Sequence, residues 1–561
     1  MSTGYILGIN GWFDRSHDAS ACIVKNGKVL AMAEEERFIR KKHAYDKTPV
    51  NSVLWCLYHL GLTLDDIEKV AVGWDYKKLY WLAKINEPRL DNLADVFFPK
   101  KYFEYNKTPR IYLVPHHLAH AASTFFLSGF SESSILIIDG QGENVSTTFA
   151  IGSGKSIKIL WSLPVEYSLG YFYEAVSDFI GFRLNEAGKT MGLAPYGNSV
   201  KYNLPQIKIT NNGFDIDLEI EKNNSSFDQQ QAIISAWQNS FKKILGCSKN
   251  RIDFVFRNIY GDITKSISLN QEYKNFAASA QFTLESILQH CVKVLIKKTS
   301  IRNLCLAGGV ALNCSANTKI KNINGIDKLF IPPFANDAGV SVGAALYVGG
   351  KREKKQFESA FVGPTFTNKE IELILKKLKI NYQKFKNIEE VTARLIHRGK
   401  IVSWFQGQME VGPRALGNRS ILANPTLLDM HKKVNEAKNR ELWRPLAPSI
   451  LDEKGESYMN GYFYSPFMLH TFQVKDSVKR KVPAIVHIDG STRPQSVRKN
   501  INPGFYKLIK FYEKLSGIPL ILNTSFNGAK EPIVCTPLDA ISSFYTNSTD
   551  YLVLSNYLIK K

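Results

Sequence analysis

The sequence predicts an α/β protein with more than one domain. At 561 residues the chain is longer than one hydrophobic core usually serves, and its 44% apolar and 12% aromatic residues can form large cores. A pattern of strand, polar loop and hairpin occurs twice in the first 161 residues, and helical segments follow each copy. This composition and this repetition argue against a disordered chain.

The first copy begins with an apolar strand at residues 5–9. A polar loop containing His17 and Asp18 leads to a strand at 19–24, and the Asn26-Gly27 turn leads to a third strand at 28–33. The second copy has the same order, with strands at 134–139, 146–151 and 157–161 separated by a glycine loop at 140–143 and a turn at 152–155. The repetition indicates the duplicated actin-like architecture, in which the two hairpin loops face each other across a nucleotide cleft.

Further segments extend this N-terminal domain to about residue 350. A buried strand at 304–307 turns through Gly308 and Gly309 toward Asn313, which is typical of a backbone that approaches a nucleotide. Residues 201–275 are polar and asparagine-rich and are interpreted as an insertion or lid. The charged run 351–356 is the expected linker, so the predicted domains are 1–350 and 357–561.

His116, His120 and Asp139 form the first candidate site. On a helix the two histidines share a face, and Asp139 closes the apolar strand Ile135–Ile138. Two imidazoles and a carboxylate suit a divalent transition metal with open coordination positions. The alternative is that the histidines are unrelated core residues.

The C-terminal region places basic residues in short turns rich in glycine or proline. A solvated helix face would space its charges helically, whereas arginines held in turns point into a site and bind phosphate or carboxylate groups. We therefore favour an anion pocket over a solvated surface. The basic residues of these turns are Arg414, Arg419, Lys438, Arg440, Arg444, Arg493 and Arg498.

Charge and cysteine content narrow the class of protein. The net charge is +21, and residues 351–561 hold 34 basic and 19 acidic residues, so most of the excess lies there. This excess fits nucleotide sites, a polyanionic partner, or simply a lysine-rich proteome.

Seven scattered cysteines without a CxxC argue against a disulfide framework or a thiolate zinc site. Without a signal-peptide pattern or a bilayer-length apolar run, a cytoplasmic protein is expected.

Ten motifs, in order along nearly the whole chain, resemble the O-carbamoyltransferase family of antibiotic-tailoring and nodulation-factor enzymes. Each motif is weak alone, and the specificity lies in their number and order. They are residues 17–20 (HDAS), 34–43 (EEERF…KH), 116–121 (HHLAHA), 139–140 (DG), 188–197 (GKTMGLAPYG), 308–313 (GGVALN), 336–339 (NDAG), 412–420 (GPRALGNRS), 444–448 (RPLAP) and 523–527 (NTSFN).

The resemblance implies an actin-like metal domain followed by a smaller α/β domain similar to threonylcarbamoyl-AMP synthase. It implies that a divalent ion of the iron type is held by His116, His120, Asp139 and Asp337. It also implies that the C-terminal pocket is lined by Lys438, Arg444, Arg493, Asn523 and Ser525, joined by Arg414 or Arg419, with Arg498 as a further candidate. His17 and Lys42 match positions beside the transfer site, where His17 is either a proton acceptor or a structural hydrogen-bond partner.

The implied chemistry has two steps. Carbamoyl phosphate and ATP, with Mg²⁺ as a candidate companion of ATP, give carbamoyl-adenylate, and the carbamoyl group then passes to a hydroxyl at the metal site. Arginine and lysine side chains offset the repulsion between the two polyanions. Because carbamoyl-adenylate hydrolyses in water, it is expected to pass between the sites without release.

The acceptor hydroxyl is not named by any motif. The high positive charge, with Lys47, Lys101, Lys107 and Arg110 near the metal segment, favours a nucleic acid such as hydroxymethylcytosine DNA, with an antibiotic or sugar hydroxyl as the alternative. Two rival classes are an actin-like sugar kinase or ATPase and a non-catalytic nucleic-acid-binding protein. No membrane partner is expected, and the oligomeric state is open, with a homodimer as one option.

Overall fold

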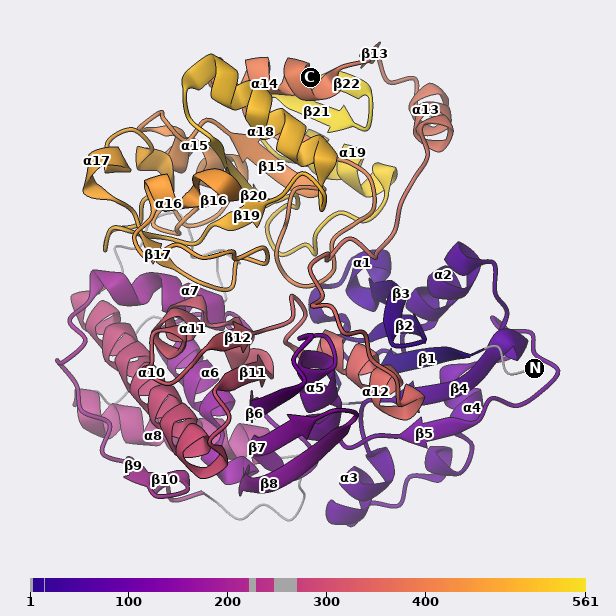
Figure 1. Cartoon of the computed structure of the whole chain (residues 1–561), viewed down its shortest axis with the longest axis vertical. Helices are drawn as coiled ribbons and strands as arrows, with labels where there is room; N and C mark the ends of the chain where they lie inside the picture. Colours follow the sequence, from indigo (N-terminus) through magenta and orange to yellow (C-terminus); the bar gives the residue numbers. More distant parts are fainter. Residues whose placement is uncertain (1–3, 15, 221–228, 247–269) are drawn as a thin grey trace. The chain divides into compact units, whose positions relative to one another are not determined.

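A computed structural model describes residues 4–14, 16–220, 229–246 and 270–561 (Figure 1). Contacts divide the chain into two compact units. The first unit comprises Met1–Glu35 and Ala44–Phe357, and the second comprises Glu36–His43 and Glu358–Lys561. The short segment 36–43 therefore belongs to the C-terminal unit, which the sequence did not predict.

The first sheet of the first unit contains a meander followed by two parallel strands. Its strand order is β3-β2-β1-β4-β5, and β1 pairs antiparallel with β2 and parallel with β4. Asn26 and Gly27, both with positive φ, form the predicted hairpin turn between β2 and β3. The strands are β1 (Tyr5–Asn10), β2 (Ser20–Lys25), β3 (Lys28–Glu34), β4 (Ile67–Val72) and β5 (Ile111–Leu113).

The second sheet of this unit repeats that topology. Its order is β12-β11-β6-β7-β8, so β6 pairs antiparallel with β7 and parallel with β11, as β1 does with its own neighbours. The predicted duplication is confirmed by this match. The strands are β6 (Glu132–Ile138), β7 (Val145–Ser153), β8 (Ser156–Pro164), β11 (Asn303–Ala307) and β12 (Lys328–Phe330).

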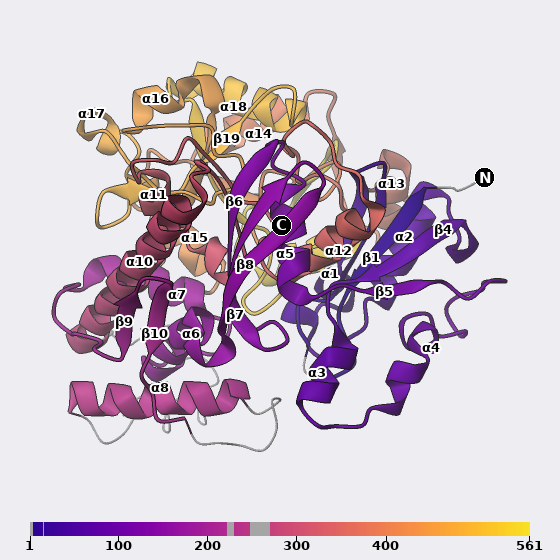
Figure 2. The ribbon, with the colours of Figure 1, turned by 60° about the horizontal axis from the view of Figure 1, so that its bottom comes forward.

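Two helices lie between the sheets, α5 (His116–Phe125) and α12 (Val340–Gly349) (Figure 2). Helix α12 packs on β1, β2 and β4, and α5 packs on β6 and β11. The helices touch each other closely because α12 is built from small residues: a Cβ on Gly343 would lie 1.8 Å from the carbonyl oxygen of Ala119. This packing fixes the start of α5, where the histidine pair lies, against the start of α12.

Other helices cover the outer faces of the first unit. Helix α2 packs on β2 and β3, and the long helix α10 packs on β6, α6 and α11. The helices are α1 (Glu35–Ile39, at the unit boundary), α2 (Val50–Leu60), α3 (Tyr76–Leu82), α4 (Leu93–Phe97), α6 (Leu169–Phe179), α7 (Ala187–Leu193), α8 (Gln229–Leu245), α10 (Gln271–Thr299) and α11 (Cys314–Lys321).

The predicted insertion at 201–275 lies partly outside the described residues. Its described parts contain a hairpin of β9 (Ile207–Thr210) and β10 (Gly213–Ile216), followed by α8, which packs on α6. The predicted linker at 351–356 packs on the first unit, because Arg352 lies over the ring of Phe125 and donates to the carbonyl oxygen of Phe130.

The second unit is a smaller α/β unit, as predicted. A mixed, mainly antiparallel sheet has the order β13-β22-β21-β14-β15-β20-β16-β19. Its strands are β13 (Gln383–Lys384), β14 (Val402–Phe405), β15 (Arg419–Ala423), β16 (Ala447–Leu451), β19 (Gln495–Val497), β20 (Leu520–Ser525), β21 (Tyr551–Leu554) and β22 (Tyr557–Lys560), and β17 (Phe472–Gln473) pairs separately with β18 (Ser491–Thr492).

The core of this unit lies between the central strands and the helices α14 and α18. Trp404, Leu422, Ile509 and Tyr512 belong to it and are buried. The helices are α13 (Asn368–Lys377), α14 (Ile388–His397), α15 (Met430–Ala437), α16 (Gly455–Tyr458), α17 (Asp476–Lys479), α18 (Pro503–Ser516) and α19 (Pro537–Thr546). None of the helices in the described ranges combines the length and the apolarity that crossing a bilayer requires.

Candidate functional site

The histidine pair lies at the start of α5, directly after Pro115. Because His116 and His120 are four residues apart on a helix, their imidazoles point from one face, and their Nε2 atoms lie 3.1 Å apart. Both side chains are fully buried. This is the arrangement that their spacing predicted.

Two buried carboxylates face these imidazoles. Asp139 follows β6, and its Oδ2 lies 3.3 Å from Nε2 of His116 and 3.7 Å from that of His120. Asp337, in the turn before α12, places Oδ1 3.6 Å from both Nε2 atoms. One donor atom from each of the four residues lies within 4.8 Å of all the others. The structure thus brings together the four residues implied as metal ligands.

Neighbouring groups orient this cluster. Nδ1 of His116 lies 3.1 Å from the carbonyl oxygen of Gly73, which keeps the proton on Nδ1 and leaves Nε2 facing the carboxylates. The Trp74 ring packs on the His116 imidazole with a centroid distance of 3.8 Å. Glu143 accepts the backbone N–H groups of His116 and Asp75 at 2.9 and 3.0 Å.

The electrostatics of the cluster favour a bound cation. Burial alone would lower the pKa of His116, but Asp337 and Asp139 raise it to about 10. Burial would raise the pKa of Asp139, yet hydrogen bonds from His116 and His120 hold it well below its usual range. Two imidazoles and two carboxylates, closely spaced and excluded from water, form a donor set that fits a divalent transition metal, which would take the place of the shared protons.

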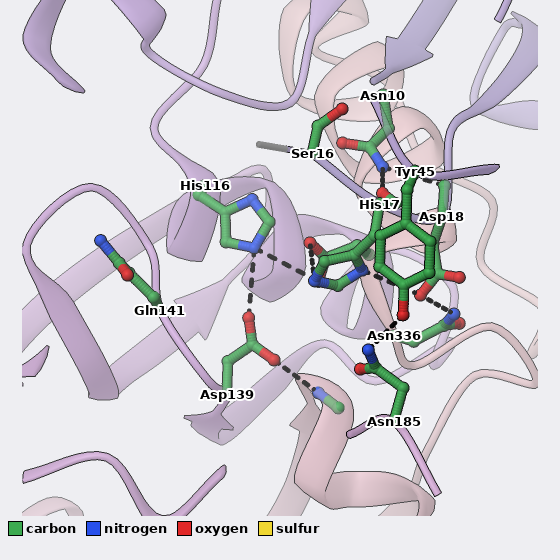
Figure 3. Close-up of polar contacts among 12 residues, drawn as sticks. Asn10, Ser16, His17, Asp18, Tyr45, His116, Asp139, Gln141, Asn185 and Asn336 are labelled. Carbon is green, nitrogen blue, oxygen red and sulfur yellow. Dashed lines mark hydrogen bonds and ion pairs between the residues drawn. The ribbon is translucent and has the colours of Figure 1, made fainter. Parts of the chain in front are cut away.

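His17 lies beside this cluster (Figure 3). Its Nε2 is 3.8 Å from Asp337 Oδ2 and its Nδ1 is 3.2 Å from Asp18 Oδ2, while 44% of the side chain is exposed. Asn10 donates to the backbone carbonyls of His17 and Asp18, and Asn336 donates to the Asp18 carboxylate. The imidazole is therefore held in place and open to a substrate.

Lys42, the second predicted catalytic residue, is exposed and lies in the segment 36–43 of the C-terminal unit. Its role beside His17 stays a prediction.

The predicted nucleotide loop after β11 instead supports the cluster. Gly308 has φ +93°, and a Cβ there would lie 2.1 Å from the carbonyl oxygen of Ile138, so only glycine fits this approach to β6. The N–H of Gly309 donates to Asp139 Oδ1 at 2.8 Å. Asn313 caps α11 and bonds Gln281. The observed contacts of these three residues are structural, and a nucleotide contact there stays a prediction.

A second cluster, in the C-terminal unit, is cationic. Lys438 is buried, and its Nζ donates to the carbonyl oxygen and Oγ of Ser525 and to the carbonyl oxygen and Oδ1 of Asn527. Burial and the charges of Arg440 and Arg444 hold the pKa of Lys438 well below its usual range. Burial, Arg444 and Arg493 lower the pKa of Arg440 in the same way. Mutual repulsion of this kind is relieved when an anion binds.

The structure distinguishes the other predicted arginines. Arg419 is fully buried and donates to the backbone carbonyls of Pro364, Gln406, Gly407 and Asn418. Its guanidinium also lies 3.6 Å from the Phe405 ring centroid, so its observed contacts are structural, and the predicted phosphate contact of Arg419 stays a prediction. Of the pair left open by the sequence, we therefore favour Arg414 for the phosphate contact.

Arg498 forms ion pairs with two acidic side chains of its own unit. It pairs with Asp452 at 2.6 Å and with Glu358 at 3.5 Å, and its guanidinium stacks 3.4 Å from the Tyr464 centroid. These contacts already compensate its charge, and its membership of the anion pocket stays a prediction.

Asn523 presents an unsatisfied acceptor on the same strand face as Ser525. Its Nδ2 donates to Ala415 O, Ser449 Oγ and Gln495 Oε1, whereas its buried Oδ1 has no hydrogen-bond partner among the described residues. A buried acceptor without a donor is costly, and a ligand N–H or O–H would satisfy it.

Comparison with known proteins agrees with this two-part organisation. The model of the carbamoyltransferase N-terminus matches residues 5–346, and that of the carbamoyltransferase C-terminus matches residues 393–561. The chain belongs to the carbamoyltransferase family. The protein is thus a carbamoyltransferase, an activity that neither the sugar-kinase nor the non-catalytic alternative includes.

Relatives match over most of the chain. Nodulation protein NolNO of Sinorhizobium fredii is 34% identical over 97% of this chain and 79% of its own length. Nodulation protein NolO of Bradyrhizobium diazoefficiens is 34% identical over 80% of this chain and 78% of its own. Among solved structures, full-length HypF in its phosphate- and nucleotide-bound form aligns with a TM-score of 0.36 and 14% identity, covering 62% of this chain and 55% of that one.

Several residues of this carbamoyltransferase were missed in the sequence. Arg440 stood in a recognised basic turn but was not assigned to the pocket, although its spacing from Lys438 and Arg444 was visible. Glu143 and Trp74 gave no signal, because their contacts with His116 depend on distant elements. Tyr45 and Asn185, which bond each other beside His17, likewise carried no motif (Figure 3).

Proposed function

We propose that the enzyme forms carbamoyl-adenylate from carbamoyl phosphate and ATP and transfers the carbamoyl group to an acceptor hydroxyl. Water converts carbamoyl phosphate to carbamate and phosphate, and a carbamate oxygen attacks the α-phosphorus of ATP and releases pyrophosphate. The acceptor oxygen then attacks the carbamoyl carbon, AMP leaves, and the hydroxyl proton passes to a base. Mg²⁺ is the proposed companion of ATP.

The cationic cluster of Lys438, Arg440, Arg444 and Arg493 carries this proposal. The depressed pKa of Lys438 reflects a buried charge with too little compensation. Binding ATP beside a second phosphorylated substrate requires such a surplus, because the two anions repel each other. The Oδ1 of Asn523, which has no hydrogen-bond partner among the described residues, suits the NH₂ of a carbamoyl group, because lysine and arginine side chains offer donors only.

The second step is assigned to the buried cluster of the first unit. A divalent cation held by His116, His120, Asp139 and Asp337, which we propose to be Fe²⁺, would supply Lewis acidity toward a carbonyl or hydroxyl oxygen. His17 is the proposed proton acceptor. Partial removal from water lowers its pKa, but Asp337 and Asp18 raise it to about 10 in the absence of an ion. A cation beside Asp337 would offset that carboxylate and favour the neutral imidazole that a base requires.

The acceptor is proposed to be a hydroxyl on a nucleic acid such as hydroxymethylcytosine in DNA. The net charge of +21 supports a polyanion, and Lys47, Lys101, Lys107 and Arg110 are all exposed on the first unit. The half-exposed Tyr45 beside His17 also favours a planar or cyclic group, which a flipped base or a sugar ring provides. A small sugar or antibiotic hydroxyl is therefore the second candidate.

Separate assays of the two half-reactions test the chemistry. Wild-type protein with ATP and carbamoyl phosphate should release pyrophosphate and form an adenylate of carbamic acid, detected by mass spectrometry of the quenched mixture. The matched variants Lys438→Met and His116→Ala should fail in the first and the second step respectively. Pyrophosphate release that does not depend on carbamoyl phosphate would sink the proposal.

A competition between acceptors tests the substrate. The enzyme is incubated with hydroxymethylcytosine DNA and an aminoglycoside together. The DNA is digested to nucleosides, and mass spectrometry of the nucleosides and of the aminoglycoside detects the added carbamoyl group. A modified nucleoside supports the nucleic-acid acceptor, whereas a modified sugar with unchanged DNA reverses the choice.

A further inference from the structure

The segment Glu36–His43 leaves the first unit and packs into the second. Arg37 is its most buried cation, with 4% of its side chain exposed, and it pairs with Glu36 at 2.9 Å. The other guanidinium nitrogen donates to the carbonyl oxygen of Gly412 at 2.9 Å. The second carboxylate oxygen of Glu36 accepts the N–H of His43, which closes the segment on itself.

Arg37 therefore holds the loop that carries Arg414. Gly412 lies two residues before Arg414, and its φ of +93° marks a sharp turn of the backbone. A buried guanidinium on a carbonyl at such a turn restricts where the following residues can lie. The same loop presents Ala415 O to Nδ2 of Asn523.

Arg40 holds a second loop, between β20 and α19. Its guanidinium donates to the carbonyl oxygens of Ile533 and Pro532 at 2.8 and 2.9 Å and lies 3.6 Å from Asp539. This loop contains Asn527, which accepts from Lys438 and donates to the carbonyl oxygen of Glu531 at 2.6 Å. These hydrogen bonds, joined through the backbone of Glu531 and Pro532, therefore connect Arg40 to the cationic cluster.

Phe38 joins the two loops. It packs on a small apolar cluster formed by Met409 and Ala415 of one loop and Ile533 and Cys535 of the other. Arg37, Phe38 and Arg40 thus contact both loops, and these loops lie more than 300 residues away from them in the sequence.

We propose that residues 36–43 support the anion pocket. In this segment, Arg37, Phe38 and Arg40 are positioning residues for Arg414 and for the contact between Lys438 and Asn527. Adenylate formation, a step assigned to the C-terminal unit, then depends on an N-terminal segment. This inference rests on the proposed function for its role in catalysis, but not for its effect on the pocket.

The test uses the full chain with Arg40→Met, at the partly exposed end of the segment, and Arg37→Met, at the buried end. Lys41→Ala is the matched control, because Lys41 is an exposed cation in the same segment. Hydrogen exchange is followed in peptides covering 409–418 and 526–536, with β14 and β15 as internal references. Affinity for inorganic pyrophosphate is measured by calorimetry.

For both variants we expect faster exchange in the two loops and unchanged exchange in β14 and β15. We also expect pyrophosphate affinity to fall by about 10- to 100-fold, and Arg40→Lys should restore part of this affinity. Unchanged loop exchange, unchanged affinity, or no pyrophosphate binding by the wild type would overturn the inference. A wild type that binds pyrophosphate but forms no adenylate would sink the proposed function alone, since the exchange and affinity results stand without turnover.

Discussion

The backbone N–H of Gly309 donates to Oδ1 of Asp139 at 2.8 Å and leaves Oδ2 facing His116 and His120. This bond ties the end of β11 to the end of β6, its parallel neighbour in the second sheet. A loop that resembles a nucleotide-binding turn in sequence thus orients one of the four candidate metal ligands. The pairing of β11 with β6 therefore determines which carboxylate oxygen of Asp139 faces the two imidazoles.

Glu143 should control the metal affinity of the proposed site without being one of its four candidate ligands. Its Oε1 accepts the N–H groups of His116 and Asp75, so Glu143→Ala removes a carboxylate from the start of α5 and leaves two donors unsatisfied. We expect metal affinity to fall by about 10- to 100-fold in Glu143→Ala and much less in Glu143→Gln, which keeps the acceptor oxygen. Competition with a chromogenic chelator measures the metal affinity, and equal affinity in the two variants would contradict this role of Glu143.

Arg414 and Arg419 should give opposite results when each is replaced by methionine. Arg419→Met leaves several buried carbonyls without donors, so the free energy of unfolding should fall by about 3 kcal/mol. Arg414→Met should keep its stability and lose affinity for ATP. Denaturant unfolding and nucleotide titration of both variants separate the two roles, and a stable Arg419→Met that fails to bind ATP would reverse the assignment.

Anion binding by the C-terminal pocket should be accompanied by proton uptake. Burial and two arginines lower the pKa of Lys438 in the free protein, whereas a bound anion favours its charged form and raises that pKa. Affinity for pyrophosphate should therefore fall as the pH rises between the two pKa values. Calorimetry in buffers of different ionisation enthalpy measures the uptake. Lys438→Arg, which stays charged, is the control and should bind without it.

Much of the fold could be predicted because its signals are local. The Asn26-Gly27 hairpin and the two copies of the strand-loop-hairpin pattern showed the duplication, and helical spacing placed His116 beside His120. Asp337 could be joined to them only through the family resemblance, because nothing in its own segment indicates which strands it will face.

Long-range pairing explains what the sequence did not reveal. The turn that holds Arg419 looks like one that presents its arginine to a ligand, yet the side chain turns inward to carbonyls brought from Pro364 and Gly407. Arg498 meets Asp452 and Glu358 in the same way. The segment 36–43 carried a family motif, but its membership of the C-terminal unit depends on loops hundreds of residues away.

The measurement that tests the account most directly is carbamoyl transfer by the purified enzyme before and after removal of bound metal, with pyrophosphate release followed in the same samples. We predict a divalent ion bound in stoichiometric amount, loss of transfer on chelation with pyrophosphate release retained, recovery on adding Fe²⁺, and no recovery in His120→Ala. Transfer that continues at the same rate in stripped protein, or wild-type levels of bound ion in His120→Ala, would contradict it.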